Sequence, residues 1–149
     1  MYNTKKLIPM MRRMIADSKP IVVCVDNSSS SGLMEGQGHL TAFLQEIRHN
    51  FPRNDIRLLV CNNAIDIDAT LYAGAEIPLI ELEYYSGTSF EPPFRVVREP
   101  PALLVYITDG YGPAPTTSDI WWSDVPVIWA LTRKDSPRHF TFGKMLKIC

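Results

Sequence analysis

The chain has 149 residues, the usual size of one domain and enough to bury a core without disulfides or structural zinc. Its composition, 46% hydrophobic and 21% charged, is that of an ordinary globular protein, and no apolar stretch is long enough to cross a membrane. The formal net charge of -1 provides no basic field, which argues against a nucleic-acid partner.

Residues 1–19 form a basic amphipathic segment ahead of the expected domain at residues 20–149. Four basic residues interrupt its apolar stretch, which is too short for a signal peptide: Lys5, Lys6, Arg12 and Arg13. Two interpretations stay open, a surface helix lying on the domain and a docking segment for a partner or an upstream module.

Four short apolar runs predict buried strands, at residues 20–25, 56–61, 102–107 and 125–131. They are apolar at adjacent positions, as expected for strands that helices cover on both faces. Apolar residues at helical spacing predict a crossover helix over residues 40–47. Cys24 and Cys61 lie in two of these runs and form no CxxC pair, so we interpret them as core thiols of a cytoplasmic protein and expect no zinc site.

The middle of the chain adds an edge strand and two short helices. Residues 65–72 alternate apolar and polar side chains, which predicts a half-exposed edge strand, whereas residues 77–84 fit either a short strand or an extended connection. Helices are predicted over residues 90–98 and 116–122. The pattern predicts a three-layer α/β/α fold with a doubly wound, mostly parallel, Rossmann-like sheet and an antiparallel edge strand.

Polar residues gather where predicted strands end, which is where such sheets bind ligands. The first strand leads into Asp26-Asn27-Ser28-Ser29-Ser30, a later strand into Thr108-Asp109-Gly110, and a Gly87-Thr88 loop precedes the proline-marked helix. Hard cations prefer oxygen ligands of these types. We therefore predict a site for one divalent cation, Mg²⁺ (or Mn²⁺ or Ca²⁺), on five residues: Asp26, Ser28, Ser30, Thr88 and Asp109. An ion with so few anionic ligands attracts an outside carboxylate, which makes the site a binding device.

The three motifs, in this order, resemble the metal-site loops of von Willebrand factor A (VWA) domains. The similarity is closest to a bacterial VWA-like domain found at the C-terminus of a family of predicted metallopeptidases. It rests also on LLVYITDGYGPAP, VPVIWALT and FTFGKMLKI, and covers roughly residues 20–148. It implies that the five residues form a metal-ion-dependent adhesion site (MIDAS). In that family the two serines and often the threonine bind the ion directly, and the aspartates often act through water.

The resemblance also implies a partner. A MIDAS binds a protein that presents a carboxylate, and VWA-like proteins of this type are commonly associated with MoxR-type AAA+ ATPases, so it implies an ATPase-linked adaptor. Two positions depart from the family pattern: Ser29 stands where Gly is usual, and Ser89 where this subgroup often has Asp. Because Ser29 adopts a tight turn less freely than Gly, a metal-free scaffold with the same fold is an alternative.

An enzyme is the other alternative. Asp26 ends a strand, as a nucleophilic Asp does in several phosphoryl-transfer folds, so a metal-dependent phosphoester hydrolase is considered. However, no second carboxylate follows two residues later, and the chain has neither a Gly-x-Ser-x-Gly elbow nor a His-Glu-x-x-His helix. We expect binding rather than catalysis. Trp121 and Trp122, close to the Thr-Asp-Gly loop, are candidate core residues or partner anchors, and Trp129 is expected in the core.

Overall fold

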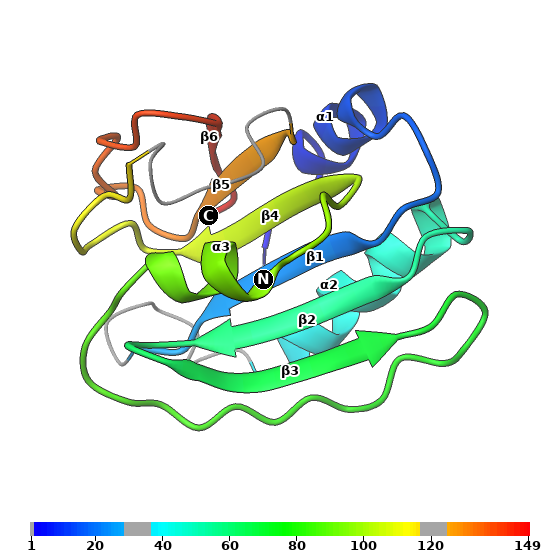
Figure 1. Ribbon diagram of the computed structural model, residues 1–149, viewed down its shortest axis with the longest axis horizontal. Helices are drawn as coiled ribbons and strands as arrows, with labels where there is room; N and C mark the ends of the chain where they lie inside the picture. Colours follow the sequence, from blue (N-terminus) through cyan, green and yellow to red (C-terminus); the bar gives the residue numbers. More distant parts are fainter. Residues whose placement is uncertain (1, 29–36, 117–124) are drawn as a thin grey trace.

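The computed structural model describes residues 2–28, 37–116 and 125–149, and these contain one six-stranded sheet of order β3-β2-β1-β4-β5-β6 (Figure 1). The strands are β1 (Ile21–Asp26), β2 (Ile56–Cys61), β3 (Ile65–Leu71), β4 (Leu103–Thr108), β5 (Val127–Leu131) and β6 (Lys144–Lys147). Only β3, at one edge, runs antiparallel to its neighbour; the other pairs are parallel.

Helices cover both faces of the sheet. One face packs against α1 (Leu7–Met14) and α2 (Gln37–Asn50), which share a buried cluster with Val23 of β1. The other face packs against α3 (Glu91–Val96), whose Phe94 shares a second cluster with Trp129. Figure 1 shows α3 on the near side of the strands, with α2 behind them. The predicted three-layer, doubly wound fold is confirmed.

Most predicted elements are present, with differences at their ends. The four buried strands and the edge strand lie where expected, while α3 is shorter than predicted because Val97 is already extended, at φ -77° and ψ 102°. Residues 77–84 are an extended connection. β6 was not predicted, and the predicted helix over residues 116–122 falls almost entirely outside the described residues.

The N-terminal segment packs on the sheet. Leu7, Ile8 and Met11 of α1 are buried in the same cluster as the strands, while Arg12 donates a hydrogen bond of 2.8 Å to the side-chain oxygen of Asn50 in α2. Within residues 2–28, 37–116 and 125–149, no helix combines the length and apolar character that a membrane span requires.

An aromatic cluster fills the α3 side of the sheet around Trp129, which is fully buried. Its ring stacks on Phe140 at 3.8 Å between centroids, and its Nε1–H donates a 2.9 Å hydrogen bond to the carbonyl of Phe142. The expectation that Trp129 is a core residue is confirmed. Cys61 is also buried here and unbridged, and burial raises its pKa to about 12, so it is an inert thiol at neutral pH.

Candidate metal centre

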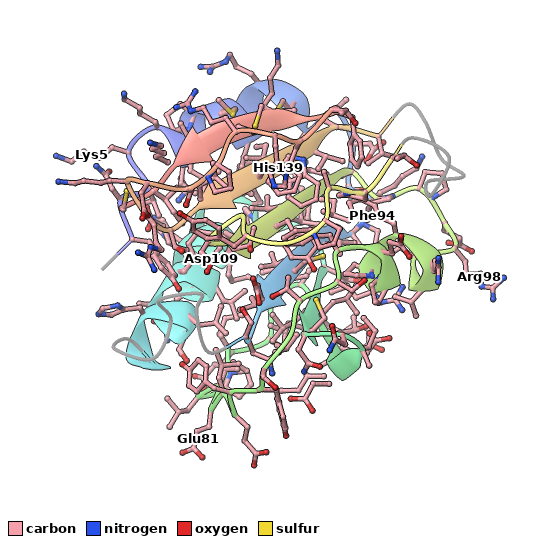
Figure 2. All side chains as sticks on the ribbon, turned by 90° about the vertical axis from the view of Figure 1, so that its left-hand side faces the viewer. Lys5, Glu81, Phe94, Arg98, Asp109 and His139 are labelled. Carbon is pink, nitrogen blue, oxygen red and sulfur yellow. The ribbon has the colours of Figure 1, made fainter. Side chains whose placement is uncertain are left out.

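The sheet has a topological switch point between β1 and β4. From β1 the chain moves outward through β2 and β3, and it then returns to the other side of β1 as β4. In open α/β sheets the carboxyl ends of strands at such a point diverge and leave a crevice for a ligand. Asp26 ends β1 and Asp109 directly follows β4, so the two predicted carboxylates lie at this point (Figure 2, which views this edge).

Asp26 is fully buried, and both of its carboxylate oxygens are hydrogen-bonded. Oδ1 accepts a 2.8 Å hydrogen bond from the backbone N–H of Ser28, and Oδ2 accepts one of 2.6 Å from the hydroxyl of Thr108. Burial raises the pKa of Asp26, the nearby Asp109 carboxylate raises it further, and the hydrogen bonds oppose that rise. Asp26 therefore ties the end of β1 to the end of β4.

Two other oxygens at this point have no hydrogen-bond partner of normal geometry among the described residues, although the nearby Ser28 hydroxyl also helps to lower the pKa of Asp26. The Ser28 hydroxyl oxygen and Asp109 Oδ2 are buried without a hydrogen bond to any described residue, although Asp109 Oδ1 accepts one of 3.0 Å from the Tyr111 N–H. An unpaired buried oxygen costs about 1–3 kcal/mol, so two at one site call for an explanation. Both are hard oxygen donors of the type that Mg²⁺ prefers, and the residues present fit such an ion.

The loop that carries Thr88 lies beside both strand ends. Its Tyr85 N–H donates a 3.0 Å hydrogen bond to the Asn27 carbonyl, and Tyr85 forms an isolated parallel bridge with Ser28. Farther along, the Thr88 methyl carbon lies 3.3 Å from where a Cβ on Gly112 would stand. The structure therefore brings together the three loops that the sequence singled out.

Gly87 allows this loop its close approach to the neighbouring chain. Its φ is +92°, a conformation that side-chain-bearing residues rarely adopt, and a Cβ there would stand 2.3 Å from the Asn63 amide nitrogen. The Gly-Thr motif is therefore structurally required here, because the residue before Thr88 must lack a side chain.

Comparison with protein families gives a match to the VWA-like domain (DUF2201) over residues 21–149. The chain belongs to this family. Comparisons with curated proteins and with solved structures found no match. The family match agrees with the fold described above, and VWA-like domains are often protein-interaction modules.

Of the five predicted ligand residues of this VWA-like domain, the structure places Asp26, Ser28, Thr88 and Asp109 on the three adjoining loops. Ser30 lies outside the described residues, as do Trp121 and Trp122, so their roles stay predictions. The described residues contain no group of three or more His, Cys, Asp or Glu side chains placed to hold a metal. The candidate centre is instead rich in hydroxyl groups.

Sequence reasoning missed the exposed aromatic residues at the rim of the VWA-like site. Tyr85 and Tyr111 are 40% and 43% exposed, and their backbones bond to Asn27 and Asp109 respectively. His139 is exposed, and its Nε2 lies 2.8 Å from the Gly110 carbonyl oxygen (Figure 2). The sequence offered one signal for these tyrosines, namely their position. Tyr85 lies two residues before the Gly-Thr motif, and Tyr111 directly follows the Thr-Asp-Gly motif.

Proposed function

We propose that this VWA-like domain binds a divalent cation, Mg²⁺ (or Mn²⁺ or Ca²⁺), and through it a carboxylate of a protein partner. The predicted ligand residues are Asp26, Ser28, Ser30, Thr88 and Asp109. The observation that carries the proposal is the pair of buried, unpaired oxygens on Ser28 and Asp109, at the switch point of the sheet. When bound, the ion would supply positive charge beside two carboxylates, those of Asp26 and Asp109.

The hydrogen bonds divide the roles of these residues. Asp109 Oδ2 and the Ser28 hydroxyl are available for direct contact, because neither is engaged by a described residue. Asp26 holds the Ser28 backbone and the Thr108 hydroxyl, so it positions the turn and adds negative charge. Thr88 stands on a separate loop, which makes it the residue best placed to respond to a partner.

The partner class follows from charge and from the family resemblance. A partner carboxylate would complete the neutralisation of the ion, which an apolar or basic group could not do. The resemblance to bacterial VWA-like proteins makes a MoxR-type AAA+ ATPase, or a client of one, our proposed partner, with the domain acting as a cytoplasmic adaptor.

Isothermal titration of the chelator-treated protein with MgCl₂ and with MnCl₂ tests the proposal. We expect saturable binding of one ion per chain, and retention of an acidic partner only while the ion is present. Absence of binding would favour the metal-free scaffold. Turnover of a generic phosphoester with bound metal would favour the hydrolase instead.

Chelation should lower the melting temperature only slightly. A site whose Kd is near the free metal concentration adds about 0.4 kcal/mol to the free energy of unfolding, because only native protein binds the ion. The two buried hydrophobic clusters, not the ion, are expected to hold the fold. Differential scanning fluorimetry with and without EDTA measures this shift, and complete unfolding by EDTA would identify the ion as structural.

Thr88→Ala should weaken partner binding more than it weakens metal binding. The other four predicted ligand residues are expected to retain the ion, with water in place of the hydroxyl. The geometry of the loop that faces the partner would then change, so partner affinity should fall about tenfold while metal affinity falls less than threefold. Titrations with metal alone, and then with partner at saturating metal, measure the two effects.

The matched control is Thr70→Ala, which removes an exposed threonine side chain on the edge strand β3. It should leave both affinities unchanged. If Thr88→Ala reduces the two affinities by the same factor, Thr88 is one more ligand and has no separate role in recognising the partner.

A further inference from the structure

In the described part of the chain, α3 covers only part of its face of the sheet. β1 has six residues and spans about 20 Å, whereas the six-residue helix α3 is only about 9 Å long. On the opposite face α2 has 14 residues and is about 21 Å long, similar to the length of β1. Among the residues that the structure describes, no helix covers the amino-terminal part of the α3 face.

A pocket of about 520 Å³ occupies this uncovered part. Its apolar walls include Val22 near the start of β1, Val97 just after α3, and Pro101 ahead of β4. Val22 and Val97 are almost fully buried as residues, so they present only small areas to the opening. The volume lies in the range typical of small-molecule sites.

Cationic side chains surround the apolar walls. Lys19, Arg57 and Arg98 line the pocket together with one carboxylate, Glu99. Arg57 is the residue paired with Val22 in the β1–β2 register, so its side chain emerges on the same face of the sheet. The residues buried in the core of that face are apolar. A charged side chain at position 57 therefore departs from the apolar pattern of the face.

All three of these cations retain donors for a ligand. Asp68 holds the Arg57 guanidinium through Nε at 3.0 Å and Nη2 at 2.8 Å, which fixes its plane and leaves Nη1 for another acceptor. Arg98 has neither an ion pair nor a hydrogen bond with any described residue, and it extends outward beyond α3 (Figure 2). Lys19 has only a weak exposed contact with Asp17, at 3.9 Å.

We infer that this pocket binds a small organic anion, with its carboxylate or phosphate head group between Arg57 and Arg98. The apolar body of the ligand would lie against the exposed rings of Pro20 and Pro100 that line the pocket, with the buried Val22 and Val97 beneath it. A planar guanidinium fork matches either head group. The site is separate from the candidate metal centre, because Val22 and Asp26 lie near opposite ends of β1.

The test is a titration of ¹⁵N-labelled protein in EDTA, followed by amide chemical shifts, so that no ion can hold the probe at the other edge. The probe is 4-phenylbutyrate, and its neutral counterpart is 4-phenyl-1-butanol. We expect saturable shifts at Val22, Arg57 and Arg98, with at least tenfold tighter binding of the anion. Inorganic phosphate, which has no apolar body, should bind more weakly than 4-phenylbutyrate.

A pair of matched variants tests whether Arg98 binds the head group of the anion. Arg98→Gln should weaken 4-phenylbutyrate binding about fivefold, as expected for loss of one partly exposed ion pair. Arg95→Gln makes the same change on α3, where Arg95 pairs with Glu91 and does not line the pocket, and should change the affinity less than twofold. Equal binding of the alcohol, shifts confined to other regions, or full affinity in Arg98→Gln would overturn the inference.

Discussion

Replacing Asp109 with Ala should reduce affinity for Mg²⁺ or Mn²⁺ by about 100-fold or more, since it removes one of the two carboxylates at the candidate centre. In EDTA the same variant should be as stable as the native protein or slightly more stable. Asp109 Oδ2 is buried and unpaired, so removing the carboxylate removes the cost of burying it, which offsets the lost hydrogen bond from the Tyr111 N–H to Oδ1. Isothermal titration and urea unfolding of the variant in EDTA measure the two effects.

Asp26→Ala provides the contrast. It should also abolish metal binding, but it should lower the free energy of unfolding by about 1–3 kcal/mol, because the Ser28 N–H and the Thr108 hydroxyl both lose their acceptor. The matched control is Asp17→Ala, whose carboxylate is exposed, precedes β1 and contacts Lys19. It should leave metal affinity unchanged. Equal metal affinity in the native protein and the Asp109 variant would refute the assignment.

Trp129→Ala should have the largest effect on stability, lowering the free energy of unfolding by about 3–5 kcal/mol. The side chain is fully buried, and its removal leaves a cavity between Tyr106 and Phe140, whose rings both stack on it. Because a domain of this size is stable by only about 5–15 kcal/mol, the loss is a large share of the total. Urea denaturation, with the midpoint and slope fitted separately, measures the change.

Trp129→Phe is the comparison variant. It keeps an aromatic ring in the stack but removes the Nε1–H donor, leaving the Phe142 carbonyl without that bond. Its loss should be smaller, about 1–2 kcal/mol. A loss below 1 kcal/mol for Trp129→Ala would mean that the neighbouring rings collapse into the space, and the cluster would then be less rigid than the stacking indicates.

Sequence reasoning predicted the strands well because their signal is local. Runs such as residues 20–25 and 102–107 are apolar at adjacent positions and short, which is typical of strands buried on both faces. β6 was missed because its sequence, KMLK, is short and has a lysine at each end. Its pairing with β5 comes from tertiary packing, which a window of four residues does not reveal.

The candidate site was predictable in outline for a different reason. Asp26 and Asp109 follow strands of one parallel sheet, so their approach at the carboxyl edge follows from the fold class. Which oxygens stay unpaired does not, because that depends on the register in which Val25 faces Ile107 and on the resulting bond between Thr108 and Asp26. The exposed Tyr85 and Tyr111 likewise depend on how the loops pass the strand ends.

The bond between Thr108 and Asp26 joins residues 82 positions apart in the chain. During synthesis, β1, β2 and β3 leave the ribosome well before β4, so a growing chain holds Asp26 and Ser28 long before it holds Asp109. Under the proposed function, an incomplete chain could not capture the ion or the partner carboxylate. The partner would then bind only chains that have been synthesised beyond β4. A chain truncated before β4 would not bind the partner, although most of its sequence is present.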